Sequence, residues 1–183
     1  MVEKLKTERE VQIDWRPFYL HPDTPPEGSE MSASFRARVT STHARLKEMA
    51  RAAGMDMVFP SHIPNTRFAH EAAEYARAHG KRLEFHRTLF RLYYSEGQDI
   101  GNWNVLRTAA QESGLDPDEM ERDVTSGKYT AAVAEQIAEA QEMEITGVPT
   151  YILNDKYAIV GAQPYEVFLQ VLERLKSEAE PEL

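Results

Sequence analysis

The sequence predicts an α/β protein in which a helical segment is inserted between the two halves of a small sheet. Three observations support this fold class. A strand-like alternation covers residues 11–18, helical spacing recurs between residues 32 and 143, and a strand–turn–strand–helix pattern covers residues 150–178. The order of one strand, a run of helices and a final hairpin is typical of a helical insertion into one sheet.

The first predicted strand, residues 11–18, has a period of two. Val11, Ile13 and Trp15 occupy one face, and the polar residues between them occupy the other. Such alternation indicates a half-buried strand. Pro17 ends it, because proline has no backbone N–H to donate to a ladder. Residues 23–32 are rich in proline and glycine without periodicity, which predicts a loop.

Six helices are predicted in the inserted segment. Ser32 or Ser34 can cap the first, and Gly54 follows its end. Asp116, Pro117 and Glu119 give the start signature of another helix. The predicted helices cover residues 32–53, 65–80, 83–95, 102–113, 116–126 and 129–143.

Pro149 lies one residue before the predicted strand 150–153, which is followed by a polar turn, a second strand at 157–160 and a helix from residue 163 to 178. A proline at this corner leaves neighbouring backbone groups free to bind another molecule. A cis bond suits the corner, and an ordinary trans proline that opens a hairpin is the alternative. The acidic tail, residues 177–183, is expected to be frayed.

Four segments together resemble one family. Gly147–Thr150 with its hairpin and helix is similar to the proline corner of thioredoxin-like proteins. The other three resemble the DsbA superfamily, and within it the FrnE-type branch. These are residues 11–18 with the loop at 20–28, residues 63–70, and residues 161–164. The resemblance runs from about Val11 to about Leu175.

The resemblance implies a thioredoxin-like sheet built from residues 1–30 and 144–183, with residues 31–143 as an all-helical insertion. It also implies that the first strand of the sheet is missing and that residues 1–6 are the end of the first helix. The family exchanges thiols and disulfides through a Cys-x-x-Cys motif, but these 183 residues contain no cysteine. Without a thiolate there is no nucleophile for this exchange. We therefore expect an upstream segment with the motif in the gene, and no redox activity in this polypeptide.

Two alternatives to a redox function remain open. The chain can be a non-redox module that binds a peptide or a small acid. It can also be a relative of the glutathione-dependent isomerases and transferases, such as 2-hydroxychromene-2-carboxylate isomerase, which it resembles in fold. The resemblance thus implies an extended peptide or a small-molecule thiol as substrate.

Five residues are candidates for substrate binding, and none is assigned a catalytic role. The resemblance places Gly147, Val148 and Pro149 at an edge that pairs with an extended substrate. Trp15 can line a neighbouring pocket or belong to the core. Asn65 lies at a helix start, where free amides favour an anion, or it simply caps the helix.

Composition excludes several other functions. The formal net charge of −9 argues against nucleic acid and against an anionic membrane surface. No apolar run approaches the roughly 20 residues of a membrane span, and there is no secretory signal, so a cytoplasmic location is expected. His70 and Glu74 supply only two ligands, too few for a zinc site. No cofactor fingerprint is present.

A sheet without its first strand leaves a gap between residues 11–18 and 150–153. The lost core contacts approach the whole stability of a domain, about 5–15 kcal/mol. The flanking strands can pair directly, a second copy can fill the gap in a homodimer, or an upstream segment can supply the strand.

Overall fold

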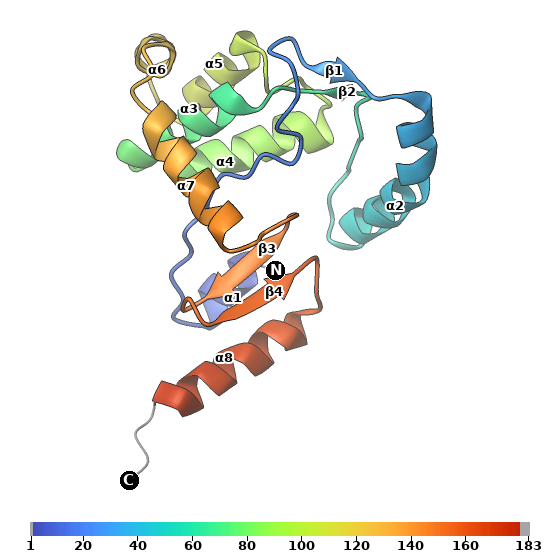
Figure 1. Ribbon diagram of the computed structural model, residues 1–183, viewed down its shortest axis with the longest axis vertical. Helices are drawn as coiled ribbons and strands as arrows, with labels where there is room; N and C mark the ends of the chain where they lie inside the picture. The colour runs from blue at the N-terminus through green and yellow to red at the C-terminus, as the bar shows by residue number, and fades with distance from the viewer. Residues whose placement is uncertain (1, 180–183) are drawn as a thin grey trace. The chain divides into compact units, whose positions relative to one another are not determined.

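The computed structural model describes residues 2–179, and its chain divides into two compact units (Figure 1). One unit contains the residues up to Leu20 and those from Gln136 onward, and the other contains His21–Glu135. Helix α7 (Thr130–Glu142) spans the second division. The described chain has much helix, a small sheet and an inserted helical region, as the sequence predicts. The subdomain boundaries at residues 30 and 144 stay a prediction.

Among the described residues, the unit built from both ends of the chain contains a hairpin, two whole helices and the second half of α7. Strand β3 (Thr150–Leu153) pairs antiparallel with β4 (Tyr157–Val160), and Thr150 lies opposite Val160. Helices α1 (Val2–Glu8) and α8 (Tyr165–Ala179) pack on it through the buried residues Leu5, Ile159 and Phe168. The predicted hairpin is confirmed, and residues 2–8 are helical; that they end a longer helix stays a prediction.

The tail prediction is wrong for residues 177–179, which continue α8. Ser177 donates a hydrogen bond to the Arg174 carbonyl at 2.8 Å, and Glu178 accepts one from the Tyr157 hydroxyl. These bonds hold the last turn of α8 in place. The rest of the predicted tail lies outside the described residues.

The strand predicted at residues 11–18 is not formed, because the segment has no ladder partner within residues 2–179. Some of its apolar residues are nevertheless packed into the core or buried. Val11 packs against the core around Phe168, and Pro17 is buried. A strand needs a neighbour to satisfy its backbone groups, and the flanking strands have not closed up on each other. Direct pairing between residues 11–18 and β3 is therefore excluded for the described chain.

The second unit is helical, with a short two-stranded ladder that the sequence did not reveal. Residues Ser29–Glu30 (β1) pair antiparallel with His62–Ile63 (β2). The predicted helices are confirmed with small shifts. They are α2 (Ala33–Ala52), α3 (Arg67–Ala78), α4 (Arg82–Phe90) with the π-helix η1 (Arg91–Ser95), α5 (Trp103–Glu112), α6 (Pro117–Thr125) and α7.

The core of this unit lies between α3, α4, α5 and α6. Small residues on α3, among them Ala72 and Ala76, are fully buried and let the neighbouring helices approach closely. Phe85, Leu106 and Met120 fill the space between the helices. The single helix predicted over residues 83–95 changes to a π-helix at Arg91, which widens its last turn.

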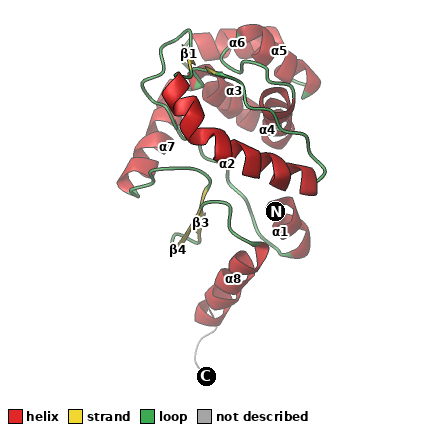
Figure 2. Cartoon of the chain, turned by 90° about the vertical axis from the view of Figure 1, so that its right-hand side faces the viewer, coloured by secondary structure: helices red, strands yellow, loops and turns green. Residues whose placement is uncertain are grey.

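Helix α2 is packed differently from the rest of this unit. It extends beside the α3–α6 bundle and is joined to it through β1 and β2 (Figures 1 and 2). The Ser32 side chain caps it by accepting a hydrogen bond from the Phe35 amide at 3.2 Å, as predicted. Of its 20 residues only Ala50 is buried. Most of the apolar surface of α2 is therefore incompletely covered.

Candidate functional site

The turn before β3 brings three of the candidate residues together. The Val148–Pro149 peptide bond is cis. The Thr150 hydroxyl donates a hydrogen bond to the Gly147 carbonyl at 2.7 Å, and the Gly161 amide donates to the Pro149 carbonyl at 2.8 Å. The turn is thus tied to β3 and to the end of β4. Val148 in this turn is 52% exposed.

The register of the hairpin determines which backbone groups of β3 are free. The Gly161–Pro149 bond belongs to the same alternating set as the pairs Tyr151–Ile159 and Leu153–Tyr157. In an antiparallel pair, residues between such hydrogen-bonded pairs direct their N–H and C=O groups to the other side. The backbone groups of Thr150 and Ile152 therefore face away from β4. No strand within residues 2–179 pairs with this side of β3, which we call the open edge.

The two faces of the hairpin differ in their surroundings. Tyr151 packs on Phe168 of α8, with ring centroids 4.9 Å apart, and burial raises the pKa of the Tyr151 hydroxyl. On the opposite face, Ile152 and Val160 are 38% and 63% exposed. The open edge is thus bordered by an apolar surface. Sequence reasoning missed Ile152 and Val160, although the apolar residues on both faces of each short strand were a usable signal.

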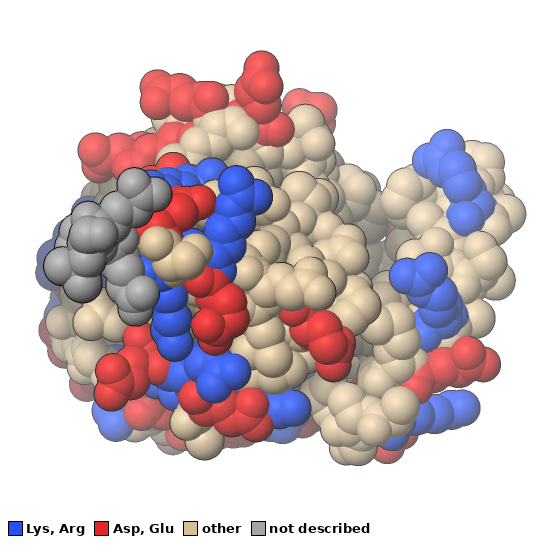
Figure 3. All heavy atoms as spheres, turned by 90° about the horizontal axis from the view of Figure 1, so that it is seen from below, with Lys and Arg blue, Asp and Glu red and all other residues tan. Residues whose placement is uncertain are grey.

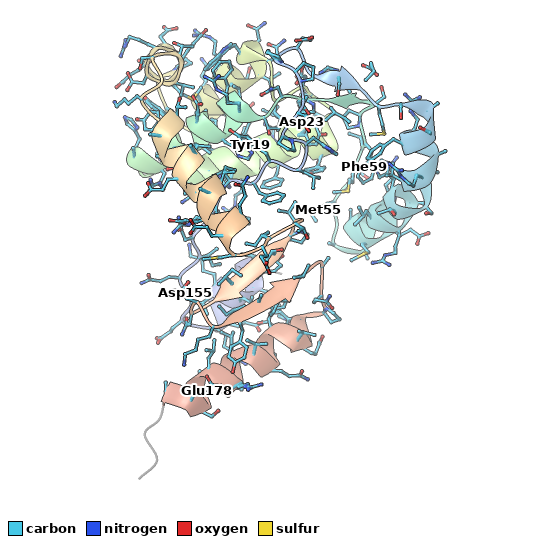
Figure 4. All side chains as sticks on the ribbon, in the orientation of Figure 1. Tyr19, Asp23, Met55, Phe59, Asp155 and Glu178 are labelled. Atoms are coloured by element: carbon cyan, nitrogen blue, oxygen red, sulfur yellow. The ribbon has the colours of Figure 1, made fainter. Side chains whose placement is uncertain are left out.

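The far end of the hairpin is held by polar contacts to α8. Glu178 accepts hydrogen bonds from Lys156 and Tyr157 of the hairpin and from Arg174 of α8. The bond from the Tyr157 hydroxyl is the largest cause that lowers the pKa of Glu178, and the same bond raises the pKa of Tyr157. Figure 4 shows Glu178 on α8 and Asp155 at the hairpin turn. These contacts give β3 a firm support at the end away from Pro149.

Trp15 lies in the same unit as this turn. It is half-buried in the irregular segment that was predicted as a strand. The neighbouring Arg16 forms ion pairs with Asp14 at 2.7 Å and with Glu139 at 3.0 Å, which fasten the segment to α7. A role for Trp15 in substrate binding stays a prediction.

Asn65 lies in the other unit, and its amide is engaged within that unit. Its Nδ2 donates to the carbonyls of Thr24 and Pro25, at 2.8 and 3.3 Å, and its Oδ1 accepts from the Arg67 amide at 3.1 Å. Asn65 thus ties the loop before β1 to the start of α3. A contact of Asn65 with a ligand stays a prediction, and it would require these bonds to be exchanged.

The remaining chemistry of the described residues is limited. No group of three or more His, Cys, Asp or Glu side chains within residues 2–179 has the arrangement of a metal site. In the same residues no helix is both long and apolar enough to cross a membrane. The open edge and the turn before it therefore offer recognition by backbone groups and apolar side chains.

Residues 1–173 match the DSBA-like thioredoxin domain, and the chain belongs to this family. Among curated proteins, it is 28% identical over 163 residues to the uncharacterized protein YwbO of Bacillus subtilis, an alignment that covers 87% of this chain and 80% of YwbO. It is 30% identical over 95 residues to the ClpXP adapter protein SpxH of Shouchella clausii, covering 49% of this chain and 32% of that protein.

Solved structures share the fold. A probable DsbA oxidoreductase from Streptomyces coelicolor superposes with a TM-score of 0.81 at 23% identity, over 92% of this chain and 76% of that one. A 2-hydroxychromene-2-carboxylate isomerase superposes with a TM-score of 0.80 at 19% identity, over 98% and 90% of the two chains. Identities this low establish a shared fold and carry no activity across.

Proposed function

We propose that this DsbA-like chain binds an extended peptide by strand addition at the open edge of β3, and that these 183 residues do not themselves exchange thiols and disulfides. The observation that carries the proposal is the free backbone of Thr150 and Ile152 beside the exposed Val148. In strand addition, main-chain hydrogen bonds supply affinity and alternate side chains supply specificity.

The backbone groups of the open edge determine which conformation the peptide must have. Thr150 and Ile152 offer two N–H donors and two C=O acceptors in an extended register. Four ladder bonds contribute about 0.5–1.5 kcal/mol each, or about 2–6 kcal/mol in total. The middle of this range, about 4 kcal/mol, corresponds to a Kd of about 1 mM when backbone contacts act alone, and its two ends correspond to about 30 mM and about 40 μM. Apolar side chains that cover Ile152 and Val160 add to this affinity.

A protein-binding role is consistent with what relatives are named for. The SpxH proteins are named as adapters, and they match about half of this chain. The redox activity of the family requires a thiolate, and the sequence contains no cysteine. We expect the purified chain to leave the rate of insulin reduction by dithiothreitol unchanged. An acceleration that persists after repurification would contradict this part of the proposal.

The binding test uses a matched pair of proline substitutions. Ile152→Pro removes an N–H from the open edge, whereas Ala158→Pro removes an N–H from the outer side of β4, because Ile152 and Ala158 lie opposite each other in the register. A hexapeptide of alternating valine and threonine is titrated while the amide resonances of Val148 and Thr150 are followed. Ile152→Pro abolishes the shifts, and Ala158→Pro retains them. Equal binding by both variants would refute edge recognition.

The peptide provides a second test that leaves the protein unchanged. N-methylation of every other residue blocks one side of an extended peptide, and shifting the methyl groups by one residue blocks the other side. One methylated peptide binds and the other does not. Sedimentation without peptide tests the homodimer, because a second copy would use the same edge and would compete with the hexapeptide.

A further inference from the structure

Helix α2 carries a concentration of positive charge in an acidic protein. Residues 33–52 contain five basic side chains and one acidic one, a net charge of +4 (5 − 1), in a chain with a net charge of −9. The basic residues are Arg36, Arg38, Arg45, Lys47 and Arg51. The remaining 163 residues therefore carry a net charge of −13 (−9 − 4).

These basic side chains form no ion pair within the described residues, unlike most arginines elsewhere, although Arg36 donates a hydrogen bond to the Met31 carbonyl and Arg38 lies over the Phe35 ring. Arg67, Arg77, Arg91 and Arg107 each form an ion pair with a carboxylate. Within the part of the chain that the structure describes, none of the five on α2 forms one. Unpaired, clustered charge raises the local potential and attracts a partner of opposite sign.

The cations border an apolar stripe. At 3.6 residues per turn, Phe35, Val39 and Leu46 share one face of α2. Arg38 and Arg45, seven residues apart, flank this face on one side, and Arg36 and Lys47 flank it on the other. None of the three stripe residues is fully buried. We call this face the α2 stripe.

The segment after α2 covers only one side of the stripe. The Phe59 ring stacks on His43, with centroids 3.9 Å apart, and Lys47 lies 5.9 Å from the same ring. Figure 4 places Met55 and Phe59 on this returning segment. Met49 and Met55 remain 46% and 58% exposed. Exposed methionines make an adaptable apolar surface, because their side chains repack around different partners.

Figure 3 shows where the charged side chains lie on one face of the surface. The part where Figure 1 places α2 presents lysine and arginine side chains among uncharged atoms, with a smaller amount of acidic surface at its lower end. An apolar stripe between two rows of cations complements a helix with an apolar face and acidic flanks. A uniformly anionic membrane fits less well, because it would also approach the remaining acidic surface and be repelled.

We propose that the α2 stripe docks an acidic amphipathic helix of a partner protein. Apolar residues of that helix cover Phe35, Val39 and Leu46, and its glutamates or aspartates pair with the two rows of cations. This is helix-in-groove recognition, read by anchors at helical spacing. The site is separate from the open edge of β3 and does not depend on peptide binding there.

The probe is a synthetic 18-residue helical peptide with leucine at every third and fourth position and glutamate elsewhere. It is compared with the same peptide carrying lysine in place of glutamate. Binding to the full chain is followed by fluorescence anisotropy of the labelled peptide. The glutamate peptide binds at low salt, weakens at least tenfold in 0.5 M NaCl, and binds at least tenfold more tightly than the lysine peptide.

Two variants locate the site, each with a control on the opposite face of α2. Val39→Asp and the double reversal Arg38→Glu with Arg45→Glu each weaken binding at least tenfold. Thr40→Asp introduces the same charge as Val39→Asp away from the stripe, Arg51→Glu reverses one charge there, and each changes binding less than threefold. Circular dichroism verifies that every variant keeps its helix content. If Val39→Asp unfolds α2, the double reversal remains as a test, because it replaces no apolar side chain of the stripe.

Three results would overturn the proposal. The first is equal binding of the glutamate and lysine peptides. The second is tighter association with phosphatidylglycerol vesicles than with the glutamate peptide, which assigns the stripe to a membrane. The third is sedimentation of the chain as a dimer that Val39→Asp dissociates, which assigns the stripe to a second copy.

Discussion

His86 makes the stability of the helical unit depend on pH. It lies on α4, half-buried, and its ring meets that of Phe90 in an edge-to-face arrangement with centroids 6.3 Å apart. The pKa of the imidazole is lowered to about 4, chiefly by burial and to a lesser extent by the positive charges of Arg82 and His70, against the opposing effect of Glu74. In the unfolded chain the pKa returns to its ordinary value of about 6.5.

The sign follows from proton binding. Because the folded pKa is lower, the unfolded state takes up a proton first as the pH falls, so stability is lost between about pH 6.5 and pH 4. The contribution of neutral His86 is nearly intact at pH 7. Linkage with these two pKa values gives a loss of about 2 kcal/mol at pH 5 and about 3 kcal/mol at pH 4.

The assay compares the wild type with His86→Gln by urea unfolding at pH 7, 6, 5 and 4.5. The substitution itself changes stability by an amount independent of pH, and other titrating groups act equally on both proteins. The stability difference between the two proteins therefore shifts by about 2 kcal/mol between pH 7 and pH 5, in favour of the variant. A difference that stays constant over this range would refute the burial of a neutral His86.

Three further predictions concern packing and helix capping inside each unit. Phe168→Ala removes the ring that packs on Tyr151 and lowers the free energy of unfolding by about 3–5 kcal/mol, measured by denaturant titration, while a loss below about 1 kcal/mol would contradict its place in the core. Gly28→Ala places a Cβ 2.3 Å from His62 Nε2, whereas Gly80→Ala places one in open space, and both glycines have a positive φ (+76° and +68°). Gly28→Ala therefore lowers the melting temperature more than Gly80→Ala does, and the reverse order would contradict this prediction. Asn102→Ala removes the cap that accepts a hydrogen bond from the Asn104 amide at 2.8 Å and costs about 1 kcal/mol, and an unchanged midpoint in urea would show that water replaces it.

Local signals predicted most of the helices and the hairpin. The cap at Ser32 and the start at Asp116 and Pro117 lie where the sequence predicts them, because a cap satisfies its own helix and needs no distant partner. The β1–β2 ladder could not be predicted, since it joins Ser29–Glu30 to His62–Ile63 with α2 between them. Two-residue strands carry no periodicity to detect.

The candidate site was predicted in part. The motif around Pro149 indicated the turn, and Gly147, Val148 and Pro149 lie together in it. The open edge became visible only from the register of the hairpin, because the register determines that Thr150 and Ile152 face away from β4. For Asn65, the sequence indicated a candidate binding residue, but the structure shows its amide hydrogen-bonded to the carbonyls of Thr24 and Pro25.

The sequence by itself determined the family, the order of the helices and the final hairpin, and the absence of a thiol nucleophile in these 183 residues, because these depend on residue types and on local spacing. The tertiary structure decided whether an alternating segment becomes a strand. Residues 11–18 have the pattern of a strand and remain irregular, since a ladder needs hydrogen-bonding groups from a second segment. For the same reason, only the folded hairpin shows which side of β3 is free to bind.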